Sequence, residues 1–298
     1  MKEYNYCVQV KENDALRSSF NELTKKTFGF NFIDWYDAGH WGDMYIPYAL
    51  LDKNKIVSNV SVNIMNFDMG GIQRKYIQLG TVMTDEAYRN KGLNRKILER
   101  ILREYEGKVD GIYLFGNGRV LDYYPKFGFR KSKEYEYYIS CESIKNIPYY
   151  KVEKIDMTIE EQREKLYETI RNYTIDTINE NDGMYMHDNI GLYQFWLDTE
   201  FGENIYYLPE LEIYLCVEIQ GEVLYLHQIW GKEEVDITCL AKSFGENIRE
   251  VVLGYTPVHK DKFSVREYKE EDSTLFILGE GLQCIEREKL KFPIMSHA

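Results

Sequence analysis

The sequence of 298 residues has few cysteines and no closely spaced pair of them. Disulfide frameworks and thiolate metal sites need an even, patterned set of cysteines. Here the five cysteines are scattered and form no Cys-x-x-Cys motif; they are Cys7, Cys141, Cys216, Cys239 and Cys284. We therefore expect reduced core thiols in a cytoplasmic protein.

Long apolar runs are absent as well. No stretch approaches the roughly 18 apolar residues that a membrane-spanning helix requires. The first residues show no signal-peptide pattern and lead directly into an expected strand at 4–10. We therefore expect no membrane partner.

Several catalytic and metal-binding motifs are also missing. The isolated histidines form neither His-x-x-x-His nor His-Glu-x-x-His, so that no metal site is expected; they are His40, His187, His227, His259 and His297. Gly-x-Ser-x-Gly is absent, which removes the commonest hydrolase signal. Neither the P-loop nor the Gly-x-Gly-x-x-Gly dinucleotide fingerprint is present.

Basic residues are outnumbered by acidic ones, giving a net charge of −12 and an isoelectric point of about 5.1. This balance argues against an extended nucleic-acid surface. An acidic surface suits a cationic amine substrate, although many proteins are acidic for solubility alone.

The length predicts about two domains. We place the boundary at residue 145, just before Pro148, giving domains of 1–145 and 146–298. In the first domain we expect a helix at 14–28, capped by Asn13 or Asp14, and an antiparallel meander of strands. Its expected strands span residues 46–52, 56–67, 74–84 and 134–140.

Residues 77–129 form the most informative segment. A strand at 77–82 and a polar turn at 84–92 lead into a helix, followed by a second strand at 112–115 and a short helix ending at Tyr124. The first helix places apolar residues on one face at helical spacing: Leu93, Ile97, Leu98, Ile101, Leu102 and Tyr105.

The turn before this helix is basic. A helix start leaves about four backbone N–H groups without partners and carries about half a positive charge. Gly92 lets the backbone approach a ligand, and Arg89, Lys91 and Arg95 add cationic side chains. Such a turn favours phosphate or pyrophosphate, although a basic turn of this kind is more often a solvated loop.

Together these motifs resemble the signature of the GCN5-related N-acetyltransferase (GNAT) family. The family's cofactor loop, Arg/Gln-x-x-Gly-x-Gly/Ala, corresponds to Arg89-Asn90-Lys91-Gly92-Leu93-Asn94. Its downstream motifs, Asn-x-x-Ala-x-x-x-Tyr and Lys-x-Gly-Phe, correspond to Asn117, Val120 and Tyr124 and to Lys126-Phe127-Gly128-Phe129. Asn94 and Val120 depart from the small residues of the family pattern. Asn tolerates the left-handed backbone conformation better than most residues.

The resemblance implies a set of contacts to acetyl-coenzyme A, the acyl-donor substrate. These residues are Val82, Met83, Arg89, Asn90, Lys91, Gly92, Leu93, Asn94, Arg95 and Asn117. It assigns Tyr124 as the catalytic acid that protonates the coenzyme A sulfur. The adjacent Tyr123 should point elsewhere on the helical turn and therefore serves as the control residue. Val82 and Met83 would act through their backbone groups. Asn117 would either bind the cofactor arm or cap the following helix.

The acceptor and the general base are less defined. The block 28–45 combines aromatic and acidic side chains, which suits a cationic amine, and Trp35, Asp37 and Trp41 are its candidate substrate contacts. The alternative is an aromatic segment that simply packs on the sheet. Asp85 and Glu86 lie near the cofactor loop, but such a pair more often belongs to a solvated turn. The terminal carboxylate after Ser296-His297-Ala298 is another candidate base, although termini usually fray.

The second half is harder to interpret. We expect helices at 158–177, 190–197 and 236–245, a hairpin of strands 212–219 and 222–230, and strands at 250–255 and 275–278. This order repeats that of the first half without its glycine loop. Our hypothesis is a degenerate second GNAT-like domain, with an unrelated α+β domain as the alternative.

We therefore predict an α+β protein with a mixed, mostly antiparallel central sheet flanked by helices, in two tandem GNAT-like domains. The resemblance implies direct acetyl transfer in a ternary complex. The expected acceptor is a small amine or an antibiotic-like polyamine, with a protein amino group as a further alternative. The rival hypothesis is a non-catalytic acyl-coenzyme A sensor or interaction module. The oligomeric state is left open, a dimer included.

Overall fold

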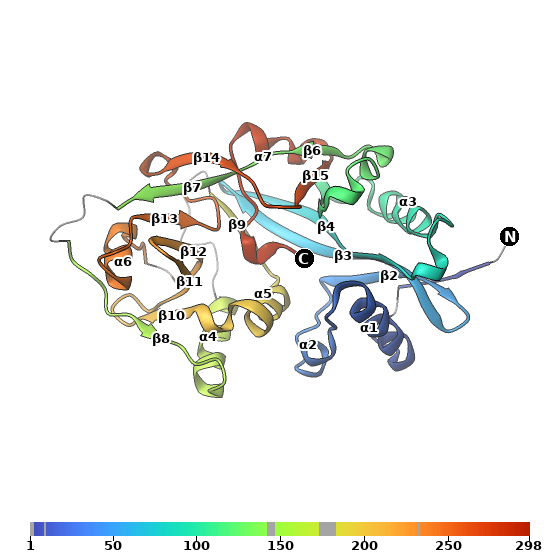
Figure 1. Ribbon diagram of the computed structural model, residues 1–298, viewed down its shortest axis with the longest axis horizontal. Helices are drawn as coiled ribbons and strands as arrows, with labels where there is room; N and C mark the ends of the chain where they lie inside the picture. The colour runs from blue at the N-terminus through green and yellow to red at the C-terminus, as the bar shows by residue number, and fades with distance from the viewer. Residues whose placement is uncertain (1–2, 9, 142–146, 173–182, 232) are drawn as a thin grey trace.

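The computed structural model describes residues 3–8, 10–141, 147–172, 183–231 and 233–298. Its strands form two sheets, one to each side of the centre of the molecule (Figure 1). The expected boundary at residue 145 lies outside the described residues. The division of the chain there stays a prediction.

The first sheet contains eight strands and is mostly antiparallel, as predicted. Among the described residues of this sheet, only β4 and β5 pair in parallel, and β9 pairs with β3 beside the main path. In spatial order the strands are β1 (Asn5–Cys7), β2 (Tyr45–Asp52), β3 (Lys55–Met69), β4 (Ile72–Thr84), β5 (Gly111–Gly116), β15 (Thr274–Leu278) and β6 (Arg130–Ser132), with β9 (Met184–His187).

The second sheet contains seven strands and also has one parallel pair, β12 with β13. In spatial order these are β14 (Ser264–Tyr268), β7 (Glu134–Ser140), β13 (Glu250–Leu253), β12 (Val223–Trp230), β11 (Ile213–Gln220), β10 (Ile205–Leu208) and β8 (Glu153–Lys154). In both sheets the parallel pair is joined through a helix. These connecting helices are α3 (Leu93–Tyr105) and α6 (Ile237–Phe244).

The two sheets exchange strands. β7 follows directly on β6 of the first sheet but pairs within the second, between β13 and β14. β15, from the last part of the chain, pairs within the first sheet between β5 and β6. Each half of the chain therefore completes the sheet of the other half.

Helices cover both faces of the first sheet. Because side chains alternate along a strand, Tyr48 and Leu50 of β2 pack with α3, whereas Ala49 and Leu51 pack with α1 (Asp14–Phe28) and α2 (Ile33–Asp37). The remaining helices are α4 (Glu160–Asn172), α5 (Ile190–Trp196), which continues as a π-helical turn at Leu197–Phe201, and α7 (Cys284–Arg287).

Most expected elements are present. The predicted apolar face of α3 is buried at Leu93, Ile97, Leu98 and Ile101, and Asn13 caps α1 through its side chain. The expected helix at 158–177 begins at Glu160, and its residues 173–177 lie outside the described residues. Five short strands were not expected: β6, β8, β9, β10 and β14. Within the part of the chain that the structure describes, no helix is both long and apolar enough to cross a membrane.

Candidate active site

The start of α3 presents unpartnered backbone amides beside cationic side chains. Gly92 caps the helix in the left-handed conformation, with φ of 70°, and no described side chain caps this end. By contrast, α1, α5 and α6 each have a side-chain cap. Arg89, Lys91 and Arg95 are exposed around the loop. This combination of amides, helix dipole and positive charge can hold a pyrophosphate.

Asn94 uses its side chain to anchor α3 to the sheet. Its Oδ1 accepts a hydrogen bond from Ser58 Oγ on β3, and Ser58 also hydrogen-bonds Thr84 of β4 at 2.9 Å. Asn94, which stands where the family pattern has a glycine or alanine, therefore contributes a hydrogen bond between α3 and the sheet. The side chain is directed toward the sheet by this bond.

A bulge interrupts β4 directly before the loop. The β3–β4 register steps from Ser61–Gly80 to Asn59–Met83, so that Thr81 and Val82 together lie opposite a single residue, Val60. Thr81 has a positive φ of 44°. A bulge of this kind bends the strand and redirects its backbone groups.

β4 and β5 diverge near the same point. They pair in parallel only from Tyr76–Gln78 to Gly111–Tyr113, whereas β4 continues to Thr84 and β5 to Gly116. Backbone groups of β4 beyond this pairing are thus available to an extended ligand lying between the strands. The predicted contacts Val82 and Met83 lie in this part of β4. The Met83 side chain itself is buried among core residues near Thr24.

Tyr124 lies on the α3 side of the sheet, at the start of a 3₁₀ turn (Tyr124–Phe127). It is 4% exposed and packs against Phe129 and Phe276, with ring centroids 5.9 and 5.4 Å away. Burial raises the pKa of Tyr124, so that the phenol keeps its proton at neutral pH. Its hydroxyl makes no hydrogen bond to a described residue. It is therefore free to donate its proton, as a catalytic acid must.

Two neighbouring polar residues are engaged in local structure. Asn117 Oδ1 accepts from the backbone N–H of Arg119 at 3.1 Å, which is the capping alternative for this residue. Asp85 accepts from Lys55 Nζ at 3.0 Å and from Ala87 N at 3.1 Å. Burial opposes ionisation of Asp85, but these hydrogen bonds outweigh it and lower its pKa. Asp85 therefore acts as a local cap and ion-pair partner.

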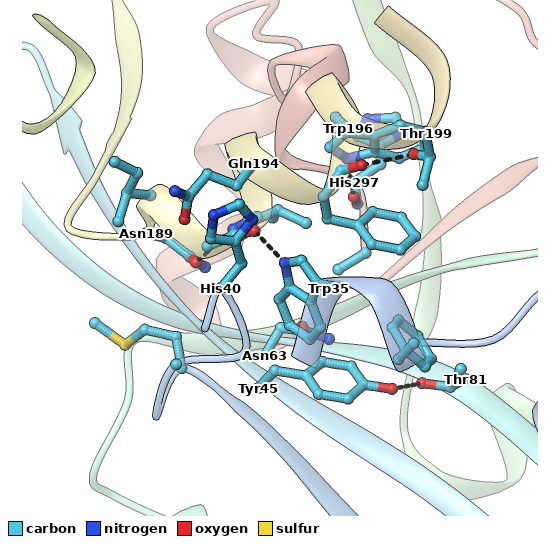
Figure 2. A pocket seen from close by; sticks show the side chains of 18 of the residues that line it. Trp35, His40, Tyr45, Asn63, Thr81, Asn189, Gln194, Trp196, Thr199 and His297 are labelled. Atoms are coloured by element: carbon cyan, nitrogen blue, oxygen red, sulfur yellow. Dashed lines mark hydrogen bonds between the residues drawn. The ribbon is translucent and has the colours of Figure 1, made fainter. Parts of the chain in front are cut away.

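A cavity of about 920 Å³ opens on the other face of the sheet (Figure 2). Its inner end reaches both diverging strands, at Thr81 of β4 and Phe115 of β5. One wall comes from the 28–45 block and the other from α5 and the C-terminal segment. The cavity therefore meets the strand divergence from the side opposite α3.

The three predicted substrate contacts have different positions. Trp35 lines the cavity, and its Nε1 donates to the backbone oxygen of Gly191 at 2.8 Å, which links α2 to α5. Trp41 is 2% exposed and stacks behind Trp35, with centroids 5.6 Å apart. Asp37 is exposed on α2 and is not among the residues that line the cavity.

The wall contributed by α5 contains none of the site residues predicted from the sequence. Nothing in the local pattern 190–196 signals a site, because only folding brings α5 against the aromatic block. Asn189 caps α5 by accepting from Leu192 N, while its Nδ2 donates to Ile64 O of β3 at 3.3 Å. Phe195 then lies within 6 Å of Phe32 and Trp35.

The C-terminal segment docks at the inner end of the cavity. Gln78 Nε2 donates to the backbone oxygen of Ala298 at 3.3 Å, and His297 stacks on Phe115 with centroids 3.9 Å apart. Burial, with Lys291 nearby, lowers the pKa of His297 to about 3, so that its imidazole is neutral at pH 7 and a weak base. The role of the terminal carboxylate as a base stays a prediction.

The described residues contain no group of three or more His, Cys, Asp or Glu side chains that could hold a metal ion. The site therefore consists of a main-chain anion cradle, a strand divergence and an aromatic cavity. Together these parts can align an extended anionic donor with an acceptor entering from the opposite face.

Comparisons with known proteins agree with this arrangement. Residues 6–132 match the family profile described as the acetyltransferase (GNAT) domain. The search of curated protein sequences found no match. Among solved structures, a probable N-acyltransferase from Enterococcus faecalis has a TM-score of 0.60 at 15% identity, covering 95% of this chain and 74% of its own.

Two further solved structures share the fold over most of the chain. A GCN5-related N-acetyltransferase from Kribbella flavida has a TM-score of 0.57 at 12% identity, covering 92% of this chain and 70% of its own. Eis1 from Mycobacterium abscessus has a TM-score of 0.55 at 9% identity, covering 92% and 73%.

Residues 6–132 are thus a GNAT acetyltransferase domain, as the motifs predicted. The likeness to these structures extends the GNAT-type fold across most of the chain, which agrees with two tandem domains. That the second domain is a degenerate copy stays a hypothesis.

Proposed function

We propose that the protein is an N-acetyltransferase that moves an acetyl group from acetyl-coenzyme A to a primary amine by direct transfer in a ternary complex. The observation that carries the proposal is the divergence of β4 and β5. The uncapped, cationic start of α3 lies on one face of the sheet at this divergence, and the inner end of the cavity lies on the other face.

The donor would lie across the first sheet. Its pyrophosphate would bind the amides at 92–95 with Arg89 and Lys91, and its pantetheine arm would pair with the backbone of Val82 and Met83. Among the described residues, the exposed Arg89 side chain pairs only with Glu86, at 3.6 Å, which leaves its guanidinium available to a phosphate. The other predicted loop contacts, Asn90, Leu93, Asn94 and Arg95, would contribute mainly through backbone groups and shape.

The chemistry requires a neutral amine to attack the thioester carbonyl. Attack forms the new C–N bond, and collapse of the intermediate breaks the C–S bond and releases the thiolate. Backbone N–H groups of the bulge would polarise the carbonyl, and Tyr124 would donate its proton to the sulfur. The proton lost by the amine passes to a base that the sequence leaves open.

Two measurements on the full chain test the proposal. The first is thermal unfolding with acetyl-coenzyme A, which at a hundredfold excess over Kd should stabilise the protein by about 2.7 kcal/mol. The matched control is S-acetyl-N-acetylcysteamine, a thioester without the pyrophosphate, which should give a much smaller shift. The second is thiol release in the presence of primary amines. A saturable shift without release by any amine would contradict the transferase and favour an acyl-coenzyme A sensor.

A further inference from the structure

Aromatic side chains form the walls of the cavity. Six of them define its shape: Phe30, Phe32, Trp35, Tyr45, Phe195 and Trp196. Their rings pack on one another, with centroids of neighbouring pairs 5.2 to 6.0 Å apart. At the entrance Phe30 is 40% exposed, so that the apolar surface continues outward. Mutual packing of this kind gives a preformed apolar site.

The polar atoms of these rings are already used inside the protein. Trp35 Nε1 donates to Gly191 O at 2.8 Å, and Trp196 Nε1 donates to His297 O at 2.8 Å. The Tyr45 hydroxyl hydrogen-bonds the Thr81 hydroxyl at 2.6 Å and accepts from Ser61 at 2.9 Å (Figure 2). Hydroxyl or amino groups of an acceptor placed against these rings would therefore lose hydration without regaining hydrogen bonds from them.

The charge around the cavity suits a cationic group at the entrance. No lysine or arginine occurs among the described residues that line it. Of the four acidic side chains that line it, Asp43 pairs with Lys11 at 3.0 Å and Asp188 contacts His187 at 2.6 Å. Glu200 and Glu270 are exposed and form no ion pair with any described residue. They can attract an amine, while the side chains at the inner end are neutral and the carboxylate of Ala298 lies among them.

We propose that the acceptor is a primary amine carried on a bulky apolar, ring-containing body, in preference to a small polar amine or a polyamine. This inference rests on the proposed function. The cavity of about 920 Å³ is large enough for a body of drug size. The amine enters past Glu200 and Glu270 and reaches the strand divergence beside Thr81, while the rings of the acceptor pack against Phe195 and Trp35.

The test compares primary amines that differ only in the attached body. The probes are 2-(biphenyl-4-yl)ethylamine and 2-phenylethylamine, compared with butylamine and spermidine. Burial of the additional rings should raise kcat/KM for the biphenyl amine at least about tenfold above butylamine and spermidine. Equal or higher values for spermidine or butylamine would overturn the inference while leaving the acetyltransferase intact.

A pair of phenylalanine variants locates the effect. Phe195→Ala removes a cavity wall on α5, and its matched control, Phe244→Ala, removes a partly buried ring on α6 that packs on Tyr206 at 4.9 Å. Phe195→Ala should abolish most of the preference for the biphenyl amine, whereas Phe244→Ala should retain it. Loss of the preference in both variants, or in neither, would contradict the inference.

A measurement of amine binding without catalysis tests this inference separately from the proposed function. Calorimetric titration of the same amines into the full chain saturated with coenzyme A needs no turnover. Tighter binding of the biphenyl amine, lost in Phe195→Ala, would support the cavity assignment even if no amine is acetylated. Absence of binding by the biphenyl amine would overturn it, whatever the activity with other amines.

Discussion

At the scale of single residues, the structure distinguishes side chains that are engaged from those that are available. The hydroxyl of Tyr45 takes part in two hydrogen bonds, whereas that of Tyr124 has no described partner. The carboxylate of Asp85 is held by Lys55, whereas the guanidinium of Arg89 is exposed. The available groups are the better candidates for contacts with the substrates, because an engaged group must first break its existing contacts.

Replacing Tyr124 with Phe should reduce kcat by one or more orders of magnitude and leave the Kd for acetyl-coenzyme A nearly unchanged. The ring keeps its contacts with Phe129 and Phe276, so that only the proton donor is lost. Steady-state kinetics and calorimetry measure the two effects. Tyr123→Phe is the control and should retain activity. Turnover equal to wild type in Tyr124→Phe would refute the acid assignment.

Reversing the charge at Arg89 should weaken acetyl-coenzyme A binding by about ten- to a hundredfold, since a charge-assisted hydrogen bond contributes about 1.5–3 kcal/mol. Calorimetric titration gives the Kd of Arg89→Glu. Lys108→Glu is the matched control, because it makes the same change in net charge on an exposed residue beyond the other end of α3. Similar weakening in both variants would mean that only overall charge matters.

At the scale of elements, the cavity depends on how closely α5 approaches the loop after α2. Gly191 makes this approach possible, because a Cβ atom there would lie 2.5 Å from the backbone oxygen of His40. The same glycine accepts the hydrogen bond from Trp35. His40 in turn contacts Asp198 at 3.0 Å, which joins the loop to the π-helical turn that follows α5.

Gly191→Ala should therefore push α5 away from the loop after α2 and widen the cavity between them. We expect a loss of stability of about 1–3 kcal/mol from overpacking and a raised KM for the amine, with the Kd for acetyl-coenzyme A retained. Gly42→Ala is the control, because its Cβ would meet no atom within 4 Å and Gly42 also lines the cavity. An unchanged amine KM in Gly191→Ala would contradict the role of this contact.

At the scale of the whole molecule, strand exchange ties the two sheets together. β15 lies inside the first sheet, next to its edge strand β6, although it comes from the last part of the chain. β7 has the corresponding position in the second sheet, next to the edge strand β14. Separating the two halves at residue 145 would remove β15 from the first sheet. The two predicted domains are therefore structurally dependent on each other.

A buried carboxylate at the start of β7 should make stability depend on pH. Burial raises the pKa of Glu134 from 4.5 to about 7, against the opposing effects of a 2.8 Å hydrogen bond from Phe292 N and of nearby Lys291. Because the folded protein binds this proton more tightly than the unfolded chain, the stabilisation is complete below pH 4.5 and is lost as pH rises through 7. The expected loss is about 3 kcal/mol.

Denaturant unfolding between pH 5 and pH 8 measures this contribution. The other titrating groups are the same in all variants, so that their effect cancels when the variants are compared. Glu134→Gln keeps an acceptor for Phe292 but carries no charge, so that its unfolding free energy should fall less than that of wild type over this range. Glu168→Gln, on the exposed side of α4, should behave as wild type. Identical slopes for wild type and Glu134→Gln would exclude Glu134 as the source.

Local pattern in the sequence determined the parts of the site that lie close together along the chain. The basic turn with Gly92, the apolar face of α3 and the spacing from Asn117 to Tyr124 predicted the GNAT domain, because a helix start and its flanking strands are encoded within about 50 residues. The aromatic block was identified as a region of interest, and Trp35 lines the cavity.

Only the tertiary structure decided how distant segments combine. The bulge at Thr81, the wall from α5 and the docking of Ala298 against Gln78 all depend on contacts between residues far apart in sequence. The placement of β15 between β5 and β6 likewise has no local signal, since a strand's own residues specify its two faces but not its neighbours. The sequence thus determined the basic loop before α3, and the fold determined the cavity on the opposite face of the sheet.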